Sequence, residues 1–135
     1  MIKVIMGLKG SGKTKKLIDS INQTAATAQG SVVCIEYGSN LRYEVKSSVR
    51  LVSSKEYGIN NLDMLKGFLS GLHAGNFDIT NVYIDNLYKT IGTDRAQGEA
   101  FVLWCAEFAQ VNNMNITITV SDDPAEASEA IKQYL

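Results

Sequence analysis

The sequence predicts a single α/β domain, a three-layer α/β/α sandwich built around a mostly parallel sheet of five strands. Short apolar runs rich in β-branched residues alternate with longer segments whose apolar residues recur at helical spacing. The chain has 135 residues with no internal repeat, low-complexity tract or linker. We therefore expect one domain covering residues 1–135.

The apolar runs are expected to form the strands of the sheet. The run at 32–36 (VVCIE) is almost continuously apolar, which is typical of a strand buried on both faces, as in parallel sheets. The expected strands cover residues 2–6, 32–36, 50–52, 81–85 and 116–120.

Four segments are predicted to be helices. They begin near Gly12, Leu62, Asp94 and Asp123, and the third, at 94–112, is apolar around much of its circumference. The last segment has Pro124 in its first turn and Glu126 three residues after Asp123, a capping-box arrangement. Residues 37–49 are polar and irregular, and they predict a loop over one end of the sheet.

Charge and composition exclude several function classes. The chain has 13 basic and 14 acidic residues, and this balance argues against broad nucleic-acid binding. No apolar stretch approaches the roughly 20 residues of a membrane span, and the first apolar run is too short for a signal peptide. We expect a cytoplasmic protein whose two cysteines, Cys34 and Cys105, are buried free thiols.

Residues 7–14 (GLKGSGKT) match the pattern G-x-x-x-x-G-K-[ST] at every fixed position. A loop that surrounds a phosphate with inward-pointing N–H groups needs glycine where the backbone is left-handed or close to the ligand. Gly7 is expected to turn the chain after the first strand, while Gly10 and Gly12 keep side chains out of the phosphate site. The following helix offers the positive end of its dipole to the anion.

The same loop predicts the residues that hold the nucleotide and its metal. Lys13 is expected to reach the β- and γ-phosphates, and the Thr14 hydroxyl is expected to bind Mg²⁺. A second metal ligand is predicted at Asp85, which ends the strand NVYID. The predicted nucleotide-binding residues of this segment are Gly7, Leu8, Lys9, Gly10, Ser11, Gly12, Lys13, Thr14 and Lys15.

These two motifs, a Walker A loop (GLKGSGKT) and a Walker B strand (NVYID), resemble those of P-loop NTPases. The order of elements is similar to the minimal core shared by RecA-like ATPases and thymidine kinases. The resemblance implies the P-loop NTPase fold, with ATP and Mg²⁺ as cofactors. It departs from thymidine kinases at Asn86, where that family has a glutamate, and from ParA/MinD-type ATPases at Leu8, where those have a lysine.

The resemblance to RecA-like ATPases also implies catalytic roles. Glu36, at the end of the second strand, corresponds to the water-activating glutamate and would act together with Lys13. Ser121, or Thr119 before it, would face the γ-phosphate as a sensor. Glu36 could instead be a solvated carboxylate, and Thr119 a β-forming residue without a role. The three arginines, Arg42, Arg50 and Arg95, are each open as an arginine finger or as surface residues.

Three functions are compatible with these motifs. The first is a small Mg-dependent ATPase or ATP-driven switch, in which the nucleotide orders residues 37–49. The alternatives are a reduced nucleoside or nucleotide kinase related to thymidine kinase, and a regulatory module that binds nucleotide without hydrolysing it. No N-K-x-D tetrapeptide is present, which favours ATP over GTP. The absence of a visible second domain or DNA-binding motif favours an unidentified protein partner or a homo-oligomer.

Overall fold

The computed structural model describes residues 1–135 and contains one sheet of five strands, each parallel to its neighbours. The order across the sheet is β1-β5-β4-β2-β3. The predicted α/β class and the five strands are confirmed, and the sheet is parallel throughout. The strands are β1 (Ile2–Gly7), β2 (Ser31–Glu36), β3 (Arg50–Ser53), β4 (Ile79–Ile84) and β5 (Asn115–Ser121).

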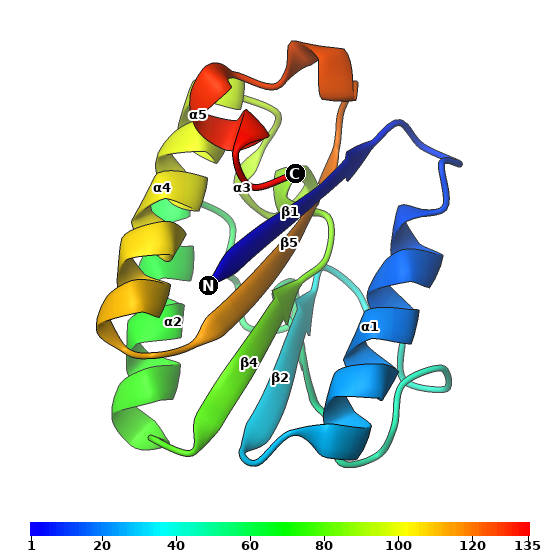
Figure 1. Cartoon of the computed structure of the whole chain (residues 1–135), viewed down its shortest axis with the longest axis vertical. Helices are drawn as coiled ribbons and strands as arrows, with labels where there is room; N and C mark the ends of the chain where they lie inside the picture. Colours follow the sequence, from blue (N-terminus) through cyan, green and yellow to red (C-terminus); the bar gives the residue numbers. More distant parts are fainter.

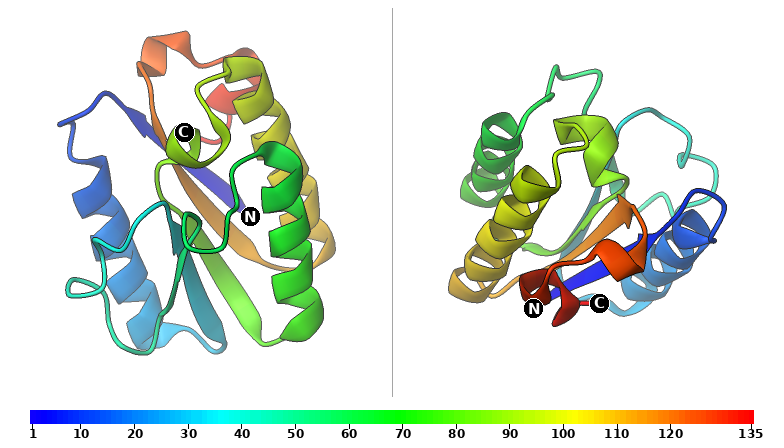
Figure 2. Two further views of the ribbon diagram at one scale, coloured as in Figure 1. Left: turned by 180° about the vertical axis from the view of Figure 1, so that it is seen from behind. Right: turned by 90° about the horizontal axis from the view of Figure 1, so that it is seen from above.

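Helices cover both faces of the sheet, so the molecule has three layers (Figure 1). Helix α1 (Lys13–Thr27) lies on one face, and α2 (Leu62–Gly75) and α4 (Arg95–Val111) lie together on the other, as Figure 2 shows from behind and from above. The larger buried cluster lies on the side of α2 and α4 and includes Leu65 and Phe101. The smaller cluster lies under α1 and includes Leu17 and Ile21.

The chain path creates a crevice at the carboxyl ends of the central strands. From β1, at one edge, the chain crosses through α1 to β2 and then to β3 at the other edge, before it returns to β4 and β5. Strand β5 therefore fills the position between β1 and β4. The chain continues from β1 into a helix on one face of the sheet and from β4 into helices on the other face. The segments that follow these two strands therefore lead away from each other. Ligands of open α/β sheets bind at such a point.

Two segments differ from the expected secondary structure. A short helix, α3 (Leu87–Ile91), follows β4 where no helix was predicted, since five residues are too few to show a helical period. The predicted C-terminal helix is divided into a 3₁₀ turn, η1 (Pro124–Glu126), and a separate helix, α5 (Glu129–Lys132). Ala127, between them, has an extended backbone. The side chain of Ser128 accepts the Ile131 N–H and caps the start of α5. The capping arrangement at Asp123 therefore begins only the single turn η1.

Cys34 and Cys105 are buried and unpaired, as expected. None of the helices combines the length and apolar character that crossing a bilayer requires.

Candidate functional site

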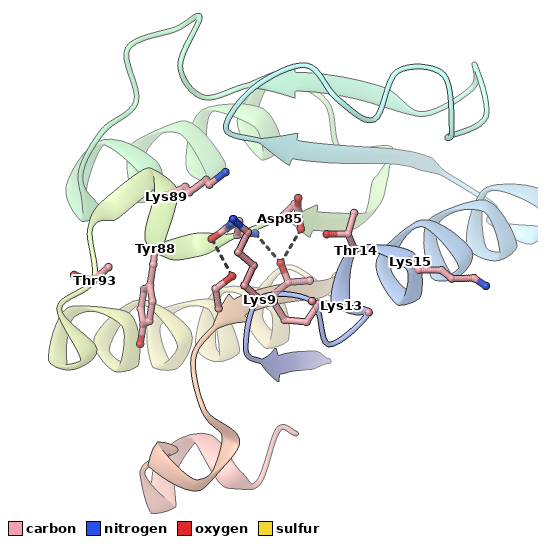
Figure 3. Close-up of a pocket in the computed structure, with 13 residues that line it drawn as sticks. Lys9, Lys13, Thr14, Lys15, Asp85, Tyr88, Lys89 and Thr93 are labelled. Atoms are coloured by element: carbon pink, nitrogen blue, oxygen red, sulfur yellow. Dashed lines mark hydrogen bonds between the residues drawn. The ribbon is translucent and has the colours of Figure 1, made fainter.

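A pocket of about 660 Å³ lies in this crevice (Figure 3). Its walls come from the loop after β1, the first turn of α1, the ends of β4 and β5, and α3. Most of the predicted site residues line it, while Gly7, Leu8, Ser11 and Glu36 do not. The lining residues are Lys9, Gly10, Gly12, Lys13, Thr14, Lys15, Asp85, Asn86, Tyr88, Lys89, Thr93, Thr119 and Ser121.

The glycines of the loop are required by its backbone. Ser11 N–H donates to the Leu8 carbonyl at 3.0 Å, which closes a turn whose third residue, Gly10, has φ of 85°. Gly12, with φ of 86°, is left-handed as well. A side chain at either position would be strained. At Gly7 the constraint is steric, because a Cβ there would collide with the Ser11 side chain.

Helix α1 begins without the side-chain cap that α2 and α4 have. Asn61 caps α2 and Asp94 caps α4 through their side chains, whereas Gly12 offers α1 no side-chain acceptor. The first turn of α1 contains no acidic residue. Its free N–H groups, and those of the loop before it, donate to no acceptor within the protein. These groups belong to Leu8, Lys9, Gly10, Gly12, Lys13, Thr14 and Lys15.

Cationic side chains outnumber acidic ones in the pocket. Lys9, Lys13 and Lys89 line it with one carboxylate, Asp85. Lys15 also lines it, but Figure 3 shows its side chain directed away along α1. None of these lysines forms an ion pair. The Lys13 ammonium donates to the Leu8 carbonyl at 3.3 Å, so it lies folded back over its own loop. The pocket is thus electropositive in a chain of net charge −1.

Asp85 is fixed by a neighbouring strand. The Thr119 hydroxyl, on β5, donates to Asp85 Oδ1 at 2.8 Å and accepts from Asn86 N–H at 2.7 Å. Asn86 itself adopts a left-handed conformation with φ of 56°, which turns the chain from β4 into α3. The Ser121 hydroxyl donates to Asn86 Oδ1 over a longer distance, 3.4 Å. Dashed lines in Figure 3 mark these contacts.

The residues suited to a metal ion are few. Thr14 and Asp85 both line the pocket, one from the start of α1 and the other from the end of β4. No cluster of three or more His, Cys, Asp and Glu side chains is present. A single carboxylate and a hydroxyl suit Mg²⁺, which keeps several waters and takes further oxygens from substrate phosphates. The donor set therefore fits a metal that arrives with a phosphate ligand.

Glu36 lies outside the pocket and is buried, with 4% of its surface exposed. Its carboxylate oxygens accept the N–H groups of Asn40 at 2.8 Å and Leu41 at 3.3 Å. Burial raises its pKa, which these two hydrogen bonds partly oppose and the charge of Asp85 further raises. The side chain thus holds the start of the 37–49 loop. The catalytic role that the resemblance implies stays a hypothesis, and the position of Glu36 outside the pocket favours the structural role.

The 37–49 loop is anchored at several points. Leu41 and Val49 are buried in the cluster under α1. The Asn22 side chain, on α1, donates to the Glu44 carbonyl at 2.8 Å and accepts Lys46 N–H at 2.9 Å. The loop is therefore held against α1 by contacts with both its side chains and its backbone.

One side of the pocket, formed by α3 and the turn after it, was not predicted from the sequence. Tyr88, Lys89 and Thr93 line the pocket opposite the phosphate loop. No signal in the sequence identifies them, because they match no motif and their position depends on how α3 packs.

Two of the three candidate arginines, Arg95 and Arg42, make defined side-chain contacts. Arg95 makes a bidentate pair with Asp122, through Nε at 2.7 Å and Nη2 at 2.9 Å. Arg42 lies over the Tyr43 ring, 4.8 Å from its centroid. Arg95 would have to leave Asp122 before it could act on a phosphate.

The comparisons with known proteins give no match, neither to a model of a protein family nor to a curated protein.

Proposed function

We propose that this chain binds a nucleoside triphosphate with Mg²⁺, preferably ATP, in a phosphate loop of the P-loop NTPase type. One observation carries the proposal: the unpaired N–H groups of the loop and of the first turn of α1 line the same pocket as three lysines without ion pairs. Such donors at a helix N-terminus bind anions, and the helix dipole adds to the attraction.

The charge of the site favours a polyphosphate over a singly charged anion. Lysine in the first turn of a helix is unfavourable because it faces the positive end of the dipole, and α1 has Lys13, Lys15 and Lys16 there. An anion of several charges would relieve this repulsion. Lys89 lines the pocket on the side opposite the loop, so the cationic lining is not confined to the loop.

Mg²⁺ would be held by the Thr14 hydroxyl and by Asp85, with the remaining ligands coming from phosphate oxygens and water. The ion would supply positive charge that neutralises the phosphates. Lys13 would exchange its contact with the Leu8 carbonyl for a phosphate oxygen, since an ionised acceptor makes the stronger hydrogen bond.

After binding, the first candidate activity is that of a small ATPase or ATP-driven switch whose partner is another protein or a second copy of the chain. A second candidate, a nucleotide-binding regulatory module with little hydrolysis, is favoured by the pocket lining. Asp85 is its only carboxylate, and it is assigned to the metal. A general base has to lie within about 3 Å of the attacking water, or act through one further water.

Lys13→Ala tests the binding site. We expect it to weaken MgATP binding, measured by calorimetry, by at least about tenfold, because an ammonium–phosphate hydrogen bond is lost. Lys16→Ala is the matched control: it removes the same charge from the same helix turn, but Lys16 does not line the pocket, so its effect on affinity should be clearly smaller than that of Lys13→Ala. Equal affinities of Lys13→Ala and the wild-type protein would refute the phosphate-loop assignment.

The two candidate activities are separated by turnover of the wild-type protein. An ATPase releases inorganic phosphate over many cycles, whereas the regulatory module retains unhydrolysed ATP after binding it. Phosphate that appears on an added nucleoside or nucleotide would instead indicate a kinase.

A further inference from the structure

Thr119 occupies the centre of the hydrogen bonds that hold Asp85. Thr119 is on β5, which lies between the phosphate-loop strand β1 and the Asp85 strand β4. The residue is fully buried. Its hydroxyl oxygen lies 2.7 Å from Asn86 N and 2.8 Å from Asp85 Oδ1. No other side-chain hydrogen bond to Asp85 is present in the structure.

The direction of these bonds follows from the donors available. Asn86 N–H can only donate, so the Thr119 oxygen accepts there. The single hydroxyl proton of Thr119 is then used on Asp85 Oδ1, which as a carboxylate oxygen can only accept. Thr119 has no proton left to donate to a phosphate oxygen while it holds Asp85. It is thus poorly suited to the sensor role considered from the sequence, for which Ser121, with its longer bond to Asn86, is better placed.

We propose that Thr119 is a positioning residue that orients the Asp85 carboxylate, leaving Oδ2 free to bind the Mg²⁺ of a metal–nucleotide complex. This inference rests on the proposed function. Residues that hydrogen-bond to a metal ligand fix its orientation, and their loss typically lowers metal affinity by about 10- to 100-fold. The Asn86 backbone in turn fixes Thr119, so the turn into α3 and the metal ligand form one hydrogen-bonded unit.

The test is a Mg²⁺ titration at a fixed concentration of a fluorescent ATP analogue, together with binding of the analogue in the presence of EDTA. Thr119→Val keeps the shape of the side chain and removes the hydroxyl. We expect it to raise the Mg²⁺ concentration at half-saturation by about tenfold and to change metal-free binding less than about twofold. Thr119→Ser, which restores the hydroxyl, is expected to return the wild-type midpoint.

Two further variants distinguish positioning from a general structural effect. Thr117→Val removes a hydroxyl from the same strand outside the pocket and should leave the Mg²⁺ midpoint unchanged. In the Asp85→Asn background, Thr119→Val should cause no additional shift, because Thr119 acts through Asp85. If Thr119→Val does not fold, Thr119→Ala is compared with Thr119→Ser in the same titration.

A wild-type Mg²⁺ midpoint in folded Thr119→Val, or in Thr119→Ala where that replaces it, would overturn the positioning role while leaving nucleotide binding intact. An equal additional shift in the Asp85→Asn background would overturn it as well. Failure of the wild-type protein to bind the analogue under any condition would instead refute the proposed function, and this inference with it.

Discussion

Two carboxylates end neighbouring strands but have different surroundings. Asp85 follows β4 and lines the pocket, while Glu36 ends β2 and is covered by the chain that follows it. The difference arises after the strands: Asn86 turns away in a left-handed conformation, whereas the backbone of Asn40 and Leu41 folds over Glu36. At the scale of the residue, the backbone next to each carboxylate decides whether it can meet a ligand.

Glu36→Gln tests which role the carboxylate has. We expect the variant to bind MgATP as the wild-type protein does and to keep any ATP turnover within about threefold, because Glu36 does not line the pocket. Phosphate release and calorimetric binding are measured on the same preparation. A decrease in turnover of about 100-fold or more with unchanged affinity would assign Glu36 as the general base.

At the level of secondary-structure elements, α4, the segment after β5 and the start of the phosphate loop are connected through Asp122. Its carboxylate accepts both hydrogen bonds of the Arg95 pair, at the start of α4, and its N–H donates to the Gly7 carbonyl at 3.1 Å. Burial and the neighbouring Asp122 charge raise the pKa of Tyr88, on α3. The Arg95–Asp122 ion pair therefore lies next to the beginning of the phosphate loop, where the elements that form the pocket meet.

This connection predicts a defined pH dependence of stability. Hydrogen bonds from Arg95 lower the pKa of Asp122 below its ordinary value. Between the folded pKa and about pH 4, where an unfolded aspartate titrates, the unfolded chain binds more protons than the folded one. The stabilisation by Asp122 is thus complete above about pH 4 and is lost as the pH falls through the lower, folded pKa.

Asp122→Asn should accordingly be less stable than the wild-type protein at pH 7, by up to about 1 kcal/mol, since Arg95 is largely solvated. The difference should become smaller as the pH is lowered from 4 to 2, as measured by urea unfolding at each pH. Glu107→Gln, an exposed change on α4, is the control and should follow the wild-type curve. A stability difference independent of pH would contradict the assignment.

At the scale of the whole molecule, stability and ligand binding depend on different parts of the structure. The larger buried cluster fills the space between the sheet and the α2–α4 layer, with Phe101 fully buried in it. The pocket lies at the carboxyl ends of the strands and is lined almost entirely by polar residues and glycines. Changes deep in the cluster should thus affect folding more than binding.

Phe101→Ala is predicted to lower the free energy of unfolding by about 3–5 kcal/mol, because it removes a fully buried aromatic ring and leaves a cavity. Leu103→Ala, on the same helix and 41% exposed, should cost less than about 1 kcal/mol. Both are measured by denaturant unfolding at pH 7. The folded fraction of each should bind MgATP with wild-type affinity; a selective loss in Phe101→Ala would show that the cluster also shapes the pocket.

The features that depend on local chemistry could be predicted from the order of the residues. Apolar runs defined the five strands, and the positions of glycine in 7–14 matched the left-handed backbone at Gly10 and Gly12. Asp94 capped the helix that was expected to begin there. These features depend on neighbours within a few residues, so a linear pattern can predict them.

Which distant residues share the pocket depends on how the elements pack in three dimensions. The insertion of β5 between β1 and β4 brings Thr119 to Asp85, 34 positions away, and the packing of α3 brings in Lys89. The fold of the 37–49 loop buries Glu36, and an extended Ala127 divides the predicted last helix. Strand order and loop packing are set by the burial of non-local apolar surface, which no pattern of neighbouring residues specifies.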